Sequence, residues 1–116
     1  GDGSQTMDMV DVRDVARANI LAARADVDDA VFNVGSETET SLLDLARVLA
    51  NAMGRPELEP IHEAERSVNP VPRRLASGEA ASSALGFRPG IGLDTGIRDL
   101  VDWWRSETRA AQDSAA

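Results

Sequence analysis

Residues 1–16 read GDGSQTMDMVDVRDVA, and within this stretch the side-chain pattern changes from that of a strand to that of a helix. Polar and apolar residues alternate from Gln5 to Val12, as they do in a half-buried strand. From Arg13 to Arg24 the apolar residues recur at helical spacing, and Asp14 lies in the first turn, where its charge interacts favourably with the helix dipole. The stretch therefore predicts a strand that leads directly into an amphipathic helix.

Two later segments also have the pattern of strands. Ala30–Gly35 is a short apolar run, rich in β-branched and aromatic residues and closed by a glycine. A run of this length and composition favours a strand over a helix. Glu57–Glu63 alternates again and contains Pro60, so it is expected to be an edge strand. The predicted fold therefore contains several short strands.

Three later stretches carry an apolar stripe at helical spacing. Ser and Gly residues at their ends can cap or terminate the helices, and Ser41 with Asp44 resembles a capping box. The three predicted helices lie between Ser41 and Gly54, between Ser77 and Gly86, and from Leu93 to Glu107. The stripe is lost beyond Glu107, so residues 108–116 are expected to form a frayed polar tail. Together with the first helix, this gives about four helices.

The composition of the chain limits what it can be. With 116 residues and 42% apolar side chains, it is large enough for one globular domain with a modest core. The formal net charge of −8 argues against nucleic acid as a partner. No apolar run approaches the roughly 20 residues of a membrane span, so no membrane partner is expected. Without cysteine or a signal-peptide pattern, a cytoplasmic location is expected.

Three residue types that matter for catalysis are absent from the sequence: cysteine, lysine and tyrosine. Their absence excludes thiolate catalysis, Schiff-base chemistry and a Tyr/Lys proton relay within this chain. The single histidine, His62, has no partner at ligand spacing, so no metal site is expected. The carboxylates of Asp8, Asp11 and Asp14 are explained by helix capping and a solvated strand face. No catalytic residue is therefore expected in this chain.

Three arginines lie in one proline-containing segment, Arg66–Ala76. Pro70 and Pro72 each remove a backbone donor and favour extended geometry in the residue before them, which predicts an extended arm. Guanidinium groups suit phosphate or carboxylate oxygens. The arginines of the arm can therefore form an anion site, or they can pair with the many surface Asp and Glu side chains.

Four stretches, taken in order, resemble one protein family. Residues 1–16 are similar to the G-D-G-x-Q-x-R-D-F-x-x-V-x-D-V-A stretch of the NAD-dependent epimerase/dehydratase family, the extended short-chain dehydrogenases that act on nucleotide sugars. Phe32–Ser36 resembles the family's F-N-V-G-S. The third and fourth stretches, which resemble R-P-G-D…A-D-x-S-K-A…L-G-W-x-P and the closing L-E-E-G-L…W helix, comprise Arg66, Arg73, Ala76, Leu85–Pro89 and Leu93–Trp103. The resemblance covers residues 1 to about 107.

The resemblance implies that the chain is the C-terminal, substrate-binding lobe of such an enzyme, with the NAD-binding Rossmann lobe missing upstream. The family's glycine-rich loop and catalytic Tyr-x-x-x-Lys are absent, so NAD is expected only in the full-length parent and not in this chain. The nucleotide-sugar-binding lobe is expected over residues 1–107. Its fold is expected to be a small α/β lobe that lacks the Rossmann domain.

The resemblance also implies which residues contact the nucleotide sugar. In the family an arginine at the position of Met7 contacts the diphosphate, and its replacement shifts the phosphate role towards the arm. The substrate-binding residues are expected to be Gln5, Met7, Asn33, Arg66 and Arg73.

Two functions from different classes are compatible with this sequence. The first is the substrate-binding part of a nucleotide-sugar epimerase or dehydratase, which clamps the diphosphate and sugar while the other lobe performs the chemistry. The alternative is a non-catalytic binding or interaction module that keeps the family fold. Separation from a Rossmann lobe would expose the edge of the Gln5–Val12 strand and apolar helix faces, so the chain is expected to self-associate.

Overall fold

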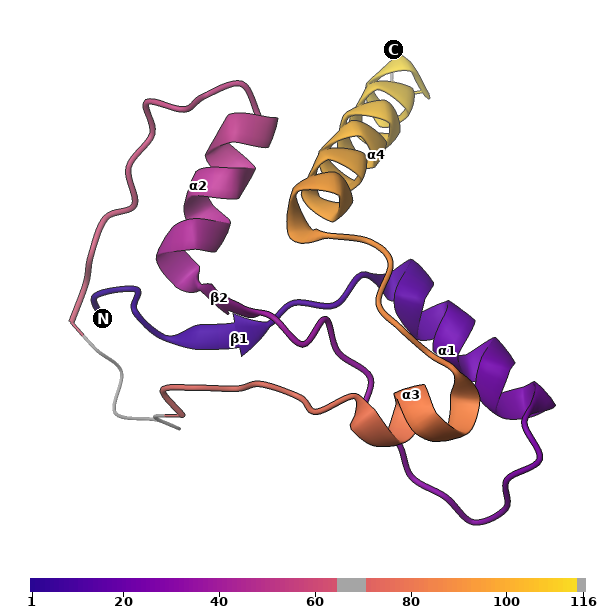
Figure 1. The fold of residues 1–116 in the computed structure, drawn as a ribbon. Helices are drawn as coiled ribbons and strands as arrows, with labels where there is room; N and C mark the ends of the chain where they lie inside the picture. Colours follow the sequence, from indigo (N-terminus) through magenta and orange to yellow (C-terminus); the bar gives the residue numbers. More distant parts are fainter. Residues whose placement is uncertain (65–70, 115–116) are drawn as a thin grey trace.

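The computed structural model describes residues 1–64 and 71–114, which form a small α/β lobe (Figure 1). Within these residues it has four helices, as the sequence predicts, and one two-stranded sheet. In chain order the elements are β1 (Thr6–Asp8), α1 (Val12–Arg24), β2 (Glu39–Ser41), α2 (Leu42–Ala52), α3 (Glu79–Leu85) and α4 (Leu93–Ser114).

β1 lies between two neighbouring segments of backbone. On one side it pairs with β2 in antiparallel register, with Thr6 opposite Ser41. On the other side the arm runs parallel to it: the Thr6 N–H donates to Pro72 O at 3.0 Å, and the Arg74 N–H donates to Thr6 O at 3.0 Å. The prediction that the β1 edge is exposed is therefore wrong, because the arm covers it.

β1 is also shorter than the predicted strand over Gln5–Val12. It ends at Asp8 because Asp11 is used to begin the next helix: its carboxylate accepts the Arg13 N–H at 2.9 Å and caps α1. The strand-to-helix order that the sequence indicates is thus confirmed, with the boundary moved towards the N-terminus.

Two further helix ends are set by residues that the sequence marks as caps, and one predicted cap is wrong. Ser41 Oγ accepts the Asp44 N–H at 3.0 Å at the start of α2, which confirms the capping box. Gly86 ends α3 in the left-handed region, with φ of 65°, which glycine adopts without a steric penalty. The predicted cap by Ser77 is wrong, because the residue before α3 is Gly78 and no side chain caps this helix.

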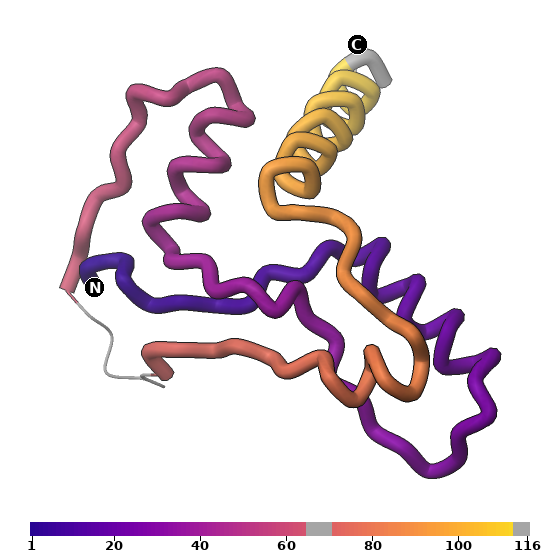
Figure 2. The backbone as a smooth tube through the Cα atoms, viewed as in Figure 1, coloured from indigo at the N-terminus to yellow at the C-terminus, as the bar shows by residue number. Residues whose placement is uncertain are grey.

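The helices pack as two pairs, seen as separate parts of the tube in Figure 2. α1 packs against α3 through a buried cluster, and α2 packs against α4. The Arg105 guanidinium donates to Met53 O at 3.1 Å, so α4 also satisfies a carbonyl at the end of α2. The buried cluster between α1 and α3 consists of Ala18, Ala81, Leu85 and Phe87, with Leu21, Ala22, Ala25, Phe32 and Val34 packed around it.

Three predicted features differ from the structure. Ala30–Gly35 and Glu57–Glu63 are not strands, because no described segment pairs with them. Phe32 and Val34 instead pack against the α1–α3 cluster. α4 continues to Ser114, so the predicted tail is helical rather than frayed up to that residue. The helix continues because packing of its N-terminal half stabilises it, even where the apolar stripe is lost.

The lobe is open and leaves many apolar side chains exposed. Its radius of gyration is 17.7 Å, whereas a compact domain of this length has about 13 Å. Val12 is 76% exposed, and Leu100 and Trp103 are more than half exposed. None of the described helices is long and apolar enough to cross a membrane.

Candidate functional site

Asp8 connects three segments that are distant in the sequence. Its carboxylate accepts the Ser36 N–H at 2.6 Å, the Ser36 hydroxyl at 2.7 Å and the Glu37 N–H at 3.1 Å. It also accepts the Ala76 N–H of the arm at 3.3 Å. Burial raises the pKa of Asp8, but these four hydrogen bonds outweigh it and hold the pKa below its ordinary value. Asp8 thus remains ionised and fixes the arm and the 35–38 loop to β1.

Gly35 has no room for a side chain because of this arrangement. A Cβ atom there would lie 2.8 Å from the Ala76 Cβ and would overlap the Asp8 carboxylate. The glycine of Phe32–Ser36 therefore lets the loop approach β1 closely, which is what allows Ser36 to donate two hydrogen bonds to Asp8.

Asp14 connects α1 to the turn between α3 and α4. Its side chain is buried and accepts the N–H groups of Gly90 and Ile91, each at 2.9 Å, and the Arg17 guanidinium at 2.7 Å. Burial raises the pKa of Asp14, and these donors outweigh it and lower the pKa. The sequence interpretation of Asp8 and Asp14 as cap and solvated strand residues is therefore incomplete: both hold distant backbone in place.

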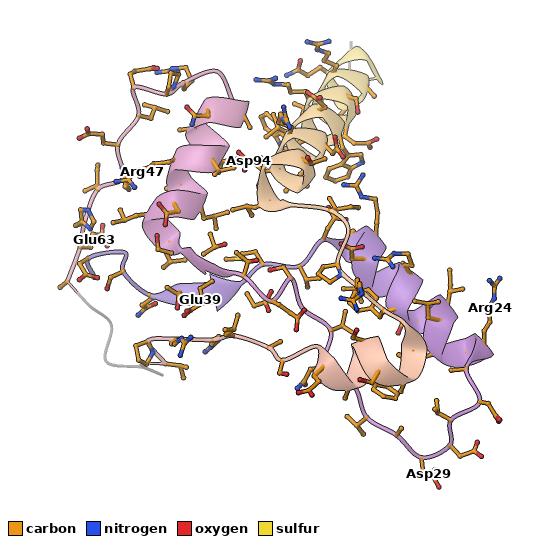
Figure 3. The ribbon with its side chains drawn as sticks, in the orientation of Figure 1. Arg24, Asp29, Glu39, Arg47, Glu63 and Asp94 are labelled. Atoms are coloured by element: carbon orange, nitrogen blue, oxygen red, sulfur yellow. The ribbon has the colours of Figure 1, made fainter. Side chains whose placement is uncertain are left out.

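Arg73, one of the predicted phosphate ligands, is engaged by a carboxylate. Its Nε and Nη2 donate to the two oxygens of Glu39 at 2.5 and 2.9 Å, and the Thr6 hydroxyl donates to the same carboxylate at 2.8 Å. Glu39 is labelled in Figure 3 beside the sheet. The hydrogen bonds from Arg73 and Thr6 lower the pKa of Glu39, so the carboxylate stays charged and paired.

The two faces of the sheet carry different side chains. Asp8 and Glu39 are directly opposite each other across β1 and β2, so with Thr6 they share one face. Met7 and its partner Thr40 occupy the other face, since successive side chains in a strand alternate. Arg73 is bound to Glu39, so Arg73 and Met7 project to opposite faces of the sheet and do not form one site.

An apolar hollow of about 850 Å³ lies between the β1–α1 connection and the N-terminal half of α4. At its rim, Arg13 donates to Asp11 at 2.9 Å and to Asp99 at 2.8 Å. The bond from Arg13 lowers the pKa of Asp11 to about 2. The apolar residues that line the hollow are Met9, Val10, Val12, Leu45, Ile91, Leu93, Ile97, Leu100 and Trp103.

Comparisons with known proteins identify the fold. No family model matches the chain. The UDP-glucose 4-epimerase of Mycolicibacterium smegmatis is 32% identical over 109 residues, which are 94% of this chain and 34% of that protein. The structure of UDP-glucose 4-epimerase from Thermotoga maritima, solved with UDP-glucose, matches with a TM-score of 0.85 at 31% identity, over 93% of this chain and 34% of that chain. Over nearly its whole length, the chain is thus similar to part of a nucleotide-sugar epimerase.

A second solved structure shows the same likeness over nearly the whole chain. The Bordetella bronchiseptica enzyme WbmF, solved with NAD+ and UDP, matches 97% of this chain and 33% of that chain, with a TM-score of 0.77 and 27% identity. The chain thus spans about a third of the length of the relatives it matches, and this third is the C-terminal lobe of the epimerase fold.

The family-based site residues are spread over several segments. Gln5 is half-buried immediately before β1, and its carbonyl accepts the Leu42 N–H at 3.0 Å. Asn33 is exposed in the loop that leads to Ser36, and Met7 is half-buried on β1. Arg66 lies outside the described residues. By alternation Gln5 and Met7 share a face, so the structure brings these two together and separates them from Arg73.

One arginine on the Gln5 and Met7 face is not among the five expected substrate-binding residues. Arg74 is exposed, and it follows Arg73 along the extended arm, so its side chain projects to the face opposite that of Arg73. The sequence predicts an extended arm, and successive side chains of an extended segment alternate between its two faces. This alternation is the signal that assigns Arg73 and Arg74 to opposite faces.

Proposed function

We propose that this lobe holds the diphosphate and sugar of a nucleotide-sugar substrate, while an NAD-binding lobe performs the epimerase or dehydratase chemistry. The observation that carries this proposal is the likeness, over nearly the whole chain, to an epimerase solved with UDP-glucose. The residues of this chain agree with a binding role. It has no lysine and no tyrosine, so a Tyr/Lys proton relay would have to come from the other lobe.

The part played by this chain would be to orient the substrate. Gln5, with its amide, and Asn33 can form hydrogen bonds with sugar or base groups, and an arginine on the arm can neutralise the diphosphate. Asp8 fixes that arm to β1 through the Ala76 N–H, which would hold the cation in position relative to β1. NAD, when bound by the parent, would accept a hydride from the sugar.

A non-catalytic binding module is the second candidate. The observation that favours it is Met7, which stands where the family has a diphosphate-binding arginine. A module of this kind would keep the Asp8 and Asp14 contacts, which support the fold, without needing the substrate contacts.

Arg66 tests the proposed function. In the protein joined to its NAD-binding lobe, Arg66→Ala is expected to raise the Michaelis constant for the nucleotide sugar by about tenfold or more, because a charge-assisted hydrogen bond worth about 1.5–3 kcal/mol is lost. Arg47→Ala is the matched control, since Arg47 is exposed on α2 and pairs with Asp44. If the Michaelis constant changes equally in the two variants, Arg66 does not contact the substrate.

The exposed apolar surface leads to a second expectation. We propose that the chain, without an NAD-binding lobe, dimerises through the hollow, because Val12, Leu100 and Trp103 of its lining are more than half exposed. Light scattering after size exclusion is expected to give a mass that rises with concentration, and Trp103→Arg is expected to reduce the association. A constant mass of one chain at every concentration would contradict the dimer.

A further inference from the structure

We propose that Arg74 provides the diphosphate-binding cation that position 7 lacks, on the face of the sheet that carries Gln5 and Met7. This inference rests on the proposed function and specifies which arginine of the arm serves it. The same positive charge would thus be supplied from the neighbouring segment of backbone rather than from β1.

The register of the arm places Arg74 beside Met7. Thr6 and Arg73 form a parallel bridge, and the Arg74 N–H donates to Thr6 O at 3.0 Å. One step further along both segments, Met7 is therefore the neighbour of Arg74. Neighbouring strands lie about 4.8 Å apart, and adjacent side chains on one face are in contact range. An Arg74 guanidinium can accordingly reach the space that an arginine at position 7 would occupy.

The two arginines of the arm differ in their availability. Arg73 uses Nε and Nη2 for a two-point contact with Glu39, and Thr6 holds that carboxylate from a third direction. Only the remaining Nη hydrogens of Arg73 are left for an anion, and the adjacent Glu39 carboxylate would repel it. Arg74 is exposed and forms no ion pair with any carboxylate in residues 1–64 or 71–114, so its donors are available to a phosphate.

The surroundings of Arg74 suit a cation that binds a ligand. Thr40, opposite Met7, is buried and forms the base of this face, and Met7 is half-buried and uncharged. The arginine stem can pack along the methionine while the guanidinium stays in water. Asp8 and Glu39, the carboxylates nearest in β1 and β2, project to the other face, so they do not neutralise Arg74.

The test is a titration of the isotope-labelled chain with UDP, followed by NMR of backbone amides and of the arginine Nε–H groups. Arg74→Met is expected to weaken UDP binding by about tenfold, whereas Arg73→Met is expected to change it by less than about twofold. Met7→Arg introduced into Arg74→Met is expected to restore binding to within about twofold of the unmodified chain. Backbone amide spectra establish that each variant keeps the fold.

The outcomes separate this inference from the proposed function. If Arg74→Met binds UDP as tightly as the unmodified chain, judged from the Gln5 and Met7 amide shifts, Arg74 is not the cation. The same conclusion holds if Arg73→Met weakens UDP binding as much as Arg74→Met does. In both cases the lobe still binds a nucleotide. If UDP shifts no resonance on this face of the unmodified chain, both the inference and the proposed function are contradicted. If Arg74→Met weakens UDP binding and the added Met7→Arg restores it, both the inference and the proposed function are supported.

Discussion

Replacing Asp14 with alanine is expected to lower the free energy of unfolding by about 2–5 kcal/mol, the largest effect of any single substitution considered for this lobe. The carboxylate is buried and accepts two backbone N–H groups, from Gly90 and Ile91, together with Arg17. Alanine leaves these donors without an acceptor and separates α1 from the turn before α4. Urea unfolding followed by circular dichroism measures the loss.

Two matched variants show whether the buried contacts are the cause. Asp99→Ala removes a carboxylate that pairs with Arg13 while half exposed, so it is expected to cost less than about 1 kcal/mol. Asp14→Asn keeps one acceptor oxygen and is expected to lie between the two alanine variants. If Asp14→Ala costs no more than Asp99→Ala, the backbone contacts of Asp14 contribute little to stability.

Gly35→Ala is expected to destabilise the lobe by about 1–3 kcal/mol, because the added methyl group would overlap the Asp8 carboxylate and lie 2.8 Å from the Ala76 Cβ. Neither neighbour can move freely, since Asp8 is held by four hydrogen bonds and Ala76 donates one of them. The free energy of unfolding from urea titration measures the effect, and the Ser36 and Ala76 amide resonances are expected to shift.

Gly92→Ala is the control for Gly35→Ala. No atom lies within 4 Å of the position that its Cβ would take, so a cost below about 1 kcal/mol is expected. Equal destabilisation by the two substitutions would mean that the cost comes from the backbone freedom of glycine and not from the contact with Asp8.

Local signals in the sequence were sufficient for the start of α2 and the end of α3. Ser41 with Asp44 begins α2 and Gly86 ends α3, and in both cases the residues that decide the boundary lie within one turn of it. Ala30–Gly35 has equally strong strand character, yet a strand needs a partner, and no described segment pairs with it. The strand prediction therefore failed where the outcome depends on distant backbone.

The contacts of the candidate site depend even more on residues that are distant in the sequence. Asp14 has the position of a first-turn carboxylate, which is how the sequence was interpreted, but its donors lie 76 and 77 positions further along the chain. No local pattern reveals such a partner. The separate roles of Arg73 and Arg74 likewise require the register of the arm with β1, which only the structure provides.

The position of β1 between β2 and the arm has a consequence for synthesis on the ribosome. β1 and β2 are made early, but the Ala76 N–H that binds Asp8 is made 68 positions later. Until the arm emerges, one side of β1 presents unpaired backbone groups that can bind another nascent chain. The arm can cover this side of β1 only after residues 72–76 have left the ribosome, so slow translation before that point would lengthen the interval in which β1 is unpaired.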